Sequence, residues 1–386
     1  MAVVAGVDSS TQSCTVELRD ADSGALLGTG RAPHARTTPP RSEQDAHGWW
    51  DALRSAFGAA VRDAGIDPGE IAAISVAAQC HGLVMLDSAG TPLRSVKLWN
   101  DTTSSPQSDR LIADLGVPGW IRVVGSVPLA AFTITKLAWV REHEPRMLDR
   151  LASVAVPHDY LTWRLTGRHV TDRSAASGTG SSASHEARWR TDLLERFVSD
   201  SIDWAPTLPT VLGPDEAAGT IAPAAAAELG LRLDVVIGPG GGDQHAGAVG
   251  LGMRDGEVAY SLGTSGVVLT TTYDPVFDDS GAVNGVSNIT GGYLPLVCTL
   301  NATKVTDTVA RLLGVGLDEL AALALAAPDR DGRPVLSAFF DGERSPNRPG
   351  GVGILGGLSN ETTREELAAA AFEGVLFGLV RGHERI

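Results

Sequence analysis

Apolar and polar positions follow the same pattern in two distant parts of the chain. Residues 4–16 read VAGVDSSTQSCTV, and residues 258–270 read VAYSLGTSGVVLT. In both segments an apolar, β-prone run leads into a turn of Gly, Ser and Thr, and a second β-prone run follows. This order predicts a β-hairpin whose tip can offer backbone N–H groups and hydroxyls to phosphate oxygens. Because each half of the chain has one such tip, the pattern indicates a duplicated fold that closes over a nucleotide.

The first half continues with a mixed order of strands and helices. Its periodicity predicts strands at 2–8, 14–20 and 25–32, a helix near 49–64 that stops at Gly65, and buried strands at 71–78 and 83–87. Three antiparallel strands, then a helix, then parallel strands differ from a Rossmann alternation. They fit one half of an α/β fold of the actin-like (ribonuclease H-like) ATPase class.

The rest of the chain predicts a second domain. Residues 102–235 read mostly as helices, and the Ser-, Gly- and Ala-rich stretch 174–187 reads as a surface loop or lid. The Gly-rich segment 235–250 marks the junction, so the expected domains are 1–239 and 240–386. The second domain is predicted to contain strands at 258–272, 284–300 and 334–340, and helices at 304–313, 317–327 and from Thr362–Thr363 onward. Compared with the first half, a closing strand and helix are missing, so this domain is expected to be incomplete.

Composition narrows the class of protein. A length of 386 residues favours two domains, and a hydrophobic content of 43% indicates a globular chain. The formal net charge of −15 argues against a nucleic-acid or anionic-membrane partner, although local N–H groups can still bind an anionic nucleotide. No apolar run reaches membrane-spanning length. The cysteines Cys14, Cys80 and Cys298 are scattered and the chain begins without a signal segment, which together predict a reducing cytoplasm.

The two hairpin tips are the candidate phosphate sites. Only the first tip has a carboxylate, Asp8, which could hold a divalent cation through water. The candidate phosphate contacts are Thr11 and Ser13 in the first tip, and Gly263, Thr264 and Ser265 in the second. Asp and Ser are also common in ordinary hairpin turns, and it is the repeat that favours the phosphate interpretation.

Asp243 is the main catalytic candidate. It follows three glycines in the segment GPGGGDQHAG, and those glycines let the backbone approach a ligand closely. A carboxylate there is well placed to accept a proton from a substrate hydroxyl. A helix N-cap Asp is the alternative, and the sequence alone favours it equally. His245 is predicted on the helix surface or in its N-terminal turn, without a role.

A second group of polar residues points to a sugar. Gln79, Cys80 and His81 follow a buried strand, and ligand sites in open α/β sheets gather at such carboxyl ends. A neutral His can pair with sugar hydroxyls as donor or acceptor. The segment KLWND at 97–101 adds Trp99 and Asp101, a composition common in sugar sites. The alternatives are a structural His and a core-packed Trp, while EQD at 43–45 reads as capping and loop structure.

Taken together, these motifs resemble the FGGY carbohydrate kinases, and within that family the pentulose kinases. The resemblance covers essentially the whole chain: VDSSTQSCTV and YSLGTSG are similar to the two phosphate motifs, and GGGDQHAGAVG to the segment with the catalytic Asp. GERSPNRPGGVGILGGL at 342–358 resembles the signature loop of the second domain, and QCHGLVMLD followed by LWND resembles the pentulose site. Family motifs often have Met where Cys80 stands.

The resemblance implies an ATP-dependent phosphotransferase in which two actin-like domains flank an interdomain cleft. D-xylulose would become D-xylulose 5-phosphate, with Asp243 as general base and Mg²⁺ near Asp8 bridging the phosphates. The implied sugar contacts are Cys80, His81, Trp99, Asp101 and Asp243, and the implied ATP-phosphate contacts are Asp8, Thr11, Ser13, Gly263, Thr264 and Ser265. A homodimer is compatible with the sequence. The family continues about a hundred residues further, into a GGG-containing adenosine motif, so an adenine site is not supported here.

Other readings stay open. The chain could be a sugar-binding remnant that keeps the pocket but lacks a complete nucleotide site, or a kinase for a different ketose or polyol. An actin-like polymerising ATPase would explain the fold but not the QCHG and LWND segments.

Overall fold

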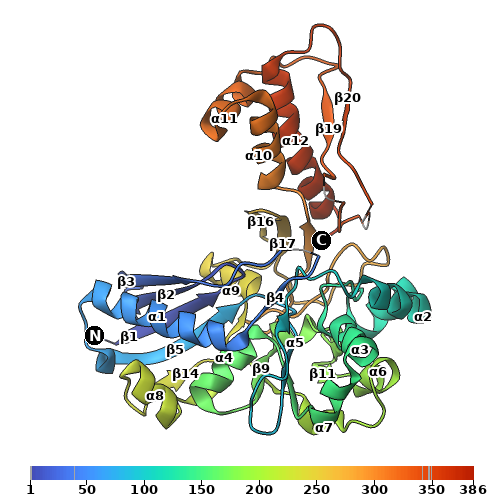
Figure 1. Ribbon diagram of the computed structural model, residues 1–386. Helices are drawn as coiled ribbons and strands as arrows, with labels where there is room; N and C mark the ends of the chain where they lie inside the picture. The colour runs from blue at the N-terminus through green and yellow to red at the C-terminus, as the bar shows by residue number, and fades with distance from the viewer. Residues whose placement is uncertain (1, 39, 341, 347, 349) are drawn as a thin grey trace. The chain divides into compact units, whose positions relative to one another are not determined.

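The computed structural model describes residues 2–38, 40–340, 342–346, 348 and 350–386 (Figure 1). The chain forms two compact units: the first extends to Gly252 and includes Val286–Tyr293, and the second contains Met253–Gly285 and Leu294–Ile386. The sequence places the boundary near residue 240, whereas here residues 241–250 pair and pack on the sheet of the first unit. Of the predicted signature loop 342–358, Asn347 and Pro349 lie outside the described residues.

The first unit is built on one mixed sheet. The strand order is β13-β14-β5-β1-β2-β3, and β15 also pairs with β5. Strands β1, β2 and β3 are antiparallel, while β14 and β15 run parallel to β5, which is itself parallel to β1. The strands are β1 (Val3–Ser9), β2 (Ser13–Asp20), β3 (Leu26–Pro33), β5 (Ile71–Ala78), β13 (Gly219–Thr220), β14 (Val236–Ile237) and β15 (Gly241–Gly242). The predicted order of three antiparallel strands, a helix and the parallel strand 71–78 is therefore confirmed. The predicted strand 83–87 is present as β6 (Val84–Leu86), but it lies outside this sheet and pairs antiparallel with β8 (Ser153–Ala155).

Helix α1 (Ala46–Ala64) covers one face of this sheet and packs against β3 (Figure 1). Asp45 caps its start by accepting a hydrogen bond from the His47 N–H, and Gly65 ends it at a φ of 66°. Its buried stripe includes Trp49, Leu53 and Phe57, as the helical spacing predicts. The prediction of a helix near 49–64 with a stop at Gly65 is thus confirmed, with a start three residues earlier.

The remaining segments of the first unit alternate short strands with helices. The helices found within the predicted helical region 102–235 include α3 (Thr133–His143) and α4 (Pro157–Thr166). The other elements are β4 (Glu43–Gln44), β6 (Val84–Leu86), β7 (Val96–Lys97), α2 (Ser105–Val124), β8 (Ser153–Ala155), β9 (Val170–Asp172), α5 (Arg173–Ser177), β10 (Ser182–Ala183), β11 (Arg188–Trp189), α6 (Thr191–Phe197), α7 (Trp204–Thr207), β12 (Thr210–Leu212), α8 (Pro223–Leu229) and α9 (Asp243–Gly250).

The stretch 174–187 is not a surface loop, and that prediction is wrong. Residues 174–184 are buried, and they form α5, a turn and β10. Small side chains let this segment pack inside, and its hydroxyls bond to local carbonyls, as Ser177 does to Ser174 and Thr179 to Ala176. A hydroxyl that is satisfied by the backbone costs little to bury, so a Ser-rich composition does not require exposure.

The second unit has a three-stranded antiparallel sheet in the order β16-β17-β18. Helix α12 packs against β17 and β18, and also against α10 and α11. Its first turn has a capping box, because Thr363 and Glu366 each bond to the other's backbone N–H. The elements are β16 (Val258–Leu262), β17 (Gly266–Thr270), β18 (Leu296–Thr299), α10 (Thr303–Leu313), α11 (Leu317–Ala326), β19 (Val335–Ser337), β20 (Ile354–Gly356) and α12 (Arg364–His383).

The packing of α1 on the sheet gives a stability prediction. Gly30→Ala in β3 should lower the free energy of unfolding, because an added Cβ would lie 2.0 Å from the Ala56 carbonyl oxygen and 2.5 Å from the Ala60 nitrogen. Overpacking of this kind costs about 1–3 kcal/mol or more. Gly6→Ala in β1 is the matched control, since its Cβ would meet nothing within 4 Å. Urea unfolding measures both, and equal stability of the two variants would contradict this packing.

Candidate active site

Parallel pairing brings three chain segments to one edge of the sheet. On one side of β5, Asp8 pairs with Ala77 and Ser9 with Ala78. On the other side, Gly241 and Gly242 pair with the same two residues of β5. The carboxyl ends of β1, β5 and β15 therefore meet, and each is followed by residues that the sequence analysis selected. This edge is where open α/β sheets bind ligands.

The glycines before Asp243 allow this segment to lie close to β5. A Cβ on Gly240, whose φ is 76°, would lie 2.5 Å from the Val76 carbonyl oxygen of β5. A Cβ on Gly242 would lie 2.5 Å from the sulfur of Cys80. The close approach that the sequence predicted is therefore made to the protein's own strand β5 and to Cys80. Without side chains here, the segment can lie against β5 and deliver Asp243 to its end.

Asp243 is the first residue of α9, and Gly242 is the N-cap, so Asp243 is not the N-cap residue of the alternative interpretation. Its Oδ1 accepts a hydrogen bond from the Gln244 N–H at 2.8 Å and lies 3.6 Å from Cys80 Sγ. Desolvation raises the pKa of Asp243 to about 6, the charge of Asp8 adds to the rise, and the Gln244 N–H opposes it. A carboxylate with a pKa in this range can take up a proton near neutral pH.

Asp8 lines a hollow on the face of the sheet formed by β1, β2 and β5. Desolvation in this recess raises the pKa of Asp8, and the Arg31 guanidinium opposes the shift. Asp8 in turn raises the pKa of Asp243, so the two carboxylates disfavour each other's charge. A divalent cation would reverse that penalty, and Mg²⁺ is commonly bound by one or two carboxylates together with substrate phosphates. These two residues fit such a site, although the described residues contain no cluster of three or more His, Cys, Asp or Glu that could hold a metal.

Cys80 and His81 lie directly after β5, as predicted. The Cys80 sulfur contacts Asp243, so the sequence-distant candidates are brought together. His81 has a φ of 65°, which is unusual for a residue with a side chain. Its Nδ1 lies 2.5 Å from the Gly178 carbonyl oxygen, and its ring stacks on Phe132 with ring centroids 4.8 Å apart.

Trp99 and Thr11 contact each other. The Trp99 indole N–H donates to the Thr11 hydroxyl at 2.8 Å, and that hydroxyl lies 3.4 Å from the Gln79 Oε1. The ring of Trp99 is half-buried. Ser13 is buried, and its hydroxyl accepts a hydrogen bond from Arg31 at 3.0 Å. Sugar contact by Trp99 and phosphate contact by the Thr11 and Ser13 hydroxyls stay predictions.

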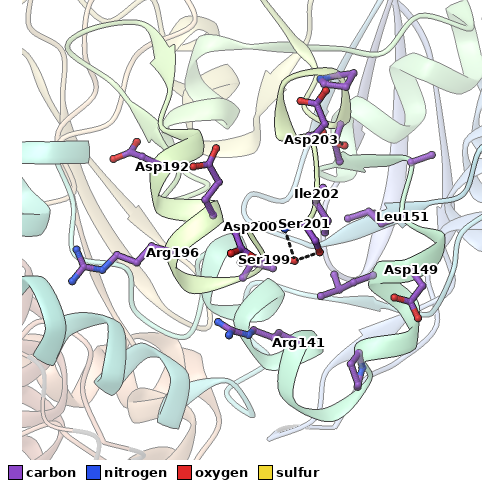
Figure 2. A pocket seen from close by; sticks show the side chains of 17 residues that line it. Arg141, Asp149, Leu151, Asp192, Arg196, Ser199, Asp200, Ser201, Ile202 and Asp203 are labelled. Atoms are coloured by element: carbon purple, nitrogen blue, oxygen red, sulfur yellow. Dashed lines mark hydrogen bonds between the residues drawn. The ribbon is translucent and has the colours of Figure 1, made fainter.

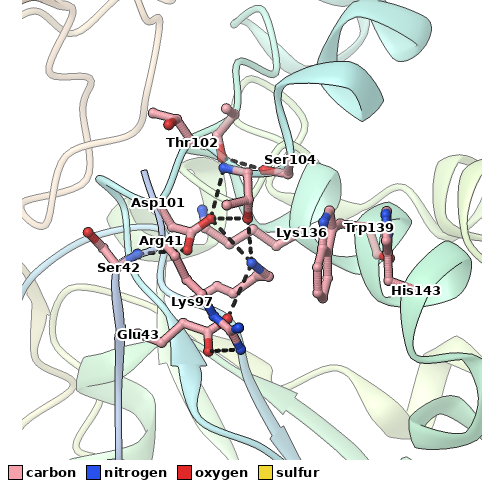
Figure 3. Close-up of polar contacts among 12 residues, drawn as sticks. Arg41, Ser42, Glu43, Lys97, Asp101, Thr102, Ser104, Lys136, Trp139 and His143 are labelled. Carbon is pink, nitrogen blue, oxygen red and sulfur yellow. Dashed lines mark hydrogen bonds and ion pairs between the residues drawn. The ribbon is translucent and has the colours of Figure 1, made fainter. Parts of the chain in front are cut away.

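Asp101 is fully buried, and this placement argues against the predicted sugar contact. Oδ1 accepts from Lys97 Nζ at 3.2 Å and from the Thr103 N–H, and Oδ2 accepts from the Ser42 N–H at 2.9 Å (Figure 3). Lys97 also pairs with Glu43 at 3.3 Å. Both carboxylate oxygens are thus used inside the protein. Glu43 belongs to this buried ion-pair network, whereas Asp45 caps α1 as expected.

The second predicted phosphate tip joins β16 to β17, since Leu262 pairs with Gly266 across it. Thr264 is exposed and Ser265 is half-buried. The Gly263 N–H donates to the Ser265 carbonyl at 3.0 Å, and the Gly263 carbonyl accepts from the Thr303 N–H at the start of α10. The tip has the predicted hairpin geometry, and its contact with phosphate stays a prediction.

Two functional candidates beside the predicted ones have unpaired polar atoms. Among the described residues, the buried Gln79 Nε2 and Asn100 Oδ1 have no hydrogen-bond partner. Because unpaired buried polar atoms are costly, both are good candidates to meet a bound hydroxyl. Gln79 is adjacent to Cys80 in QCHG, and Asn100 lies between Trp99 and Asp101 in LWND. This adjacency to the predicted sugar contacts is the signal by which the sequence could identify them.

His245 lies in the first turn of α9, which is one of the two positions predicted for it, and only 3% of it is exposed. Burial lowers the pKa of His245 to about 4, so the ring is neutral at pH 7. Nδ1 would lie 2.8 Å from a Cβ on Gly242, which places the ring behind the turn that presents Asp243.

A separate hollow lies away from these residues (Figure 2). It is lined by segments around Arg141, Asp149 and Ser199–Asp203, and it includes none of the predicted site residues within the described chain. Its lining arginines are engaged, as Arg196 pairs with Asp114. This hollow is not part of the candidate active site.

The sequence matches both domains of the FGGY family of carbohydrate kinases, the N-terminal domain at residues 3–250 and the C-terminal domain at residues 258–386. The chain belongs to this family and is a phosphotransferase. It is 42% identical over 379 residues to the xylulose kinase of Streptomyces rubiginosus, covering 98% of this chain and 75% of the relative. The predicted actin-like α/β class and the predicted family are confirmed.

Solved structures agree with this assignment. The crystal structure of xylulose kinase from Bifidobacterium adolescentis has a TM-score of 0.86 and 38% identity, covering 99% of this chain and 83% of that one. Gluconate kinase from Lactobacillus acidophilus has a TM-score of 0.91 at 23% identity, covering 99% of this chain and 78% of that one, and shares the fold. No helix in the described part of the chain is long and apolar enough to cross a membrane.

The raised pKa of Asp243 predicts a pH-dependent gain in stability from Asp243→Asn. The folded pKa of about 6 lies above the ordinary 3.8, so this group favours folding at low pH, and that contribution is lost as pH rises through 6. The amide side chain of the variant does not ionise and so avoids this loss. At pH 8 the free energy of unfolding of the variant should therefore exceed that of the parent protein, by at most about 3 kcal/mol. The gain should shrink steadily toward pH 4.

Calorimetric melting from pH 4 to pH 8 measures this difference. Asp22→Asn, at an exposed turn position, is the control and should follow the parent protein throughout. A gain that is the same at both ends of the pH range would show that desolvation of Asp243 is not its cause.

Proposed function

We propose that this carbohydrate kinase transfers the γ-phosphoryl group of ATP to a pentulose, D-xylulose, with Asp243 as general base. The observation that supports this most is the contact of Asp243 with Cys80 at the carboxyl end of β5, where His81 follows. A desolvated carboxylate is thereby set beside groups that can hold sugar hydroxyls. The relatives that are 42% and 41% identical to this chain are named xylulose kinases, which supports the same substrate.

In the proposed reaction, Asp243 accepts the proton of the terminal sugar hydroxyl. The oxygen's electron pair forms the new bond to the γ-phosphorus, the bond from that phosphorus to the bridging oxygen breaks, and ADP leaves. The proton on Asp243 then returns to solvent. Mg²⁺ held near Asp8 would neutralise phosphate charge when bound. The exposed second tip, Gly263–Ser265, is the proposed phosphate contact of the second unit.

The sugar contacts are assigned by the polar atoms at this edge of the sheet. His81, Gln79 and Asn100 offer acceptors and donors for hydroxyls, and the ring of Trp99 offers a face for sugar C–H groups.

A coupled ADP-release assay with D-xylulose, glycerol and gluconate tests this proposal, together with calorimetric titration of each sugar. We expect turnover with D-xylulose and much less with the other two. Asp243→Ala should keep sugar binding and lose at least about 100-fold in kcat, the lower range for removal of a general base. Binding of D-xylulose without ADP release from the parent would favour the sugar-binding alternative, and equal kcat in the variant would exclude Asp243 as the base.

His81→Ala should raise the KM for D-xylulose more than the KM for ATP. A lost hydrogen bond to a hydroxyl is worth about 0.5–1.5 kcal/mol, which corresponds to roughly a 2- to 13-fold change. His47→Ala, which removes an exposed imidazole on α1, is the matched control. Steady-state kinetics with each substrate varied in turn measures both, and a selective effect on the KM for ATP would contradict the assignment.

A further inference from the structure

His81 has a backbone conformation that must be held by its surroundings. Among the described residues, His81 and Ala187 are the non-glycine residues with positive φ. Such a conformation is unfavourable for a residue with a Cβ and persists where neighbouring groups impose it. A strained residue at the carboxyl end of β5, next in sequence to Cys80, whose sulfur contacts Asp243, calls for an explanation from the contacts around it.

Two side chains of α3 bind the carbonyl oxygen of His81. The Thr133 hydroxyl donates to it at 3.1 Å, and Lys136 Nζ donates to it at 3.3 Å. Both residues are buried, and Lys136 is 0% exposed. Lys136 Nζ also donates to the carbonyl oxygens of Ala131 and Phe132. Figure 3 shows Lys136 on α3, near the buried Lys97 network.

A buried ammonium near the N-terminus of a helix has costs that its contacts must offset. The helix dipole disfavours positive charge there, and desolvation of the ammonium is costly. An apolar residue of similar length would avoid both costs. The feature that Lys136 provides instead is a fixed set of donors to carbonyl oxygens, and one of these carbonyls belongs to His81.

The ring of His81 is fixed as well. Its Nδ1 lies 2.5 Å from the Gly178 carbonyl oxygen, and because a carbonyl can only accept, Nδ1 has the proton in the neutral ring. Nε2 is then the acceptor nitrogen. A Cβ on Gly178 would come within 2.9 Å of the ring, and Phe132 stacks on the ring with a 24° angle between the planes. The backbone, the tautomer and the ring plane are each set by a separate contact.

We infer that Thr133 and Lys136 are positioning residues that hold His81 in its left-handed conformation, so that its ring presents Nε2 as a hydrogen-bond acceptor for a sugar hydroxyl. This inference rests on the proposed function for the identity of the sugar. Thr133 and Lys136 of α3 would thus affect the affinity for the sugar through His81, without contacting the substrate themselves. Replacing either residue should therefore change the KM for the sugar only while His81 is present.

The test compares Thr133→Val with Thr135→Val. Both variants remove a buried hydroxyl from the same helix, but Thr135 bonds to the Leu129, Ala130 and Phe132 carbonyls instead of to His81. Thr133→Val should raise the KM for D-xylulose about 3- to 10-fold with a smaller change in kcat, as expected for one lost hydrogen bond. Thr135→Val should leave this KM within about 2-fold. Lys136→Met should resemble Thr133→Val, and Tm values identify any variant that is not folded.

A double-mutant cycle separates positioning from general destabilisation. In a His81→Ala background, Thr133→Val and Lys136→Met should cause no further rise in the KM for D-xylulose. Additive effects in the two backgrounds, or equal effects of Thr133→Val and Thr135→Val, would overturn the inference.

A second readout does not depend on turnover. Nitrogen chemical shifts of the labelled histidines, with His81 assigned by its loss in His81→Ala, report which ring nitrogen has the proton. We expect Nδ1–H in the parent and a shift toward Nε2–H in Thr133→Val and Lys136→Met. An unchanged tautomer in both variants, or Nε2–H in the parent, would overturn the inference. If the tautomer shifts as expected while no pentulose is phosphorylated, the proposed function fails and the positioning role stands.

Discussion

The structure of the candidate site depends on the parallel register of β1, β5 and β15. Pairing of Asp8 and Gly241 with the same residue, Ala77, sets the ends of three chain segments side by side. A slip of one residue in either pairing would turn the side chains that follow to the other face of the sheet. The glycines before Asp243 permit this register, because a Cβ at Gly240 or Gly242 would collide with β5 or with Cys80. The chemistry proposed for Asp243 thus follows from a backbone constraint.

Unfavourable local features collect around this edge of the sheet. Asp243 is desolvated and repelled by Asp8, His81 has a positive φ, and Lys136 is a buried ammonium. Each feature lowers stability on its own, and together they fix a base and an acceptor in defined positions. Preorganisation of this kind is what phosphoryl transfer requires, since the protein contributes mainly through positioning and charge. The rest of the first unit, with α1 packed on the sheet, provides the stability that allows these costs.

The sequence predicted the parts of this arrangement that depend on local pattern. Both hairpins, the helix ending at Gly65, the strand 71–78 and the positions of Cys80, His81 and Asp243 follow from periodicity and from motifs that resemble the family. The parts that were wrong or missed depend on long-range contacts. The stretch 174–184 is buried because distant segments cover it, and Asp101 is used by Ser42 and Lys97, which no spacing rule connects to it.

The central claim is that the sugar binds at the carboxyl ends of β1, β5 and β15 with its terminal hydroxyl toward Asp243. A crystal structure of the protein with D-xylulose tests this most directly. The account predicts one terminal hydroxyl within about 3 Å of an Asp243 carboxylate oxygen, the range for a general base and its proton donor. It also predicts another hydroxyl at hydrogen-bond distance from His81 Nε2. D-xylulose bound elsewhere, or bound here with both terminal hydroxyls away from Asp243, would contradict the account.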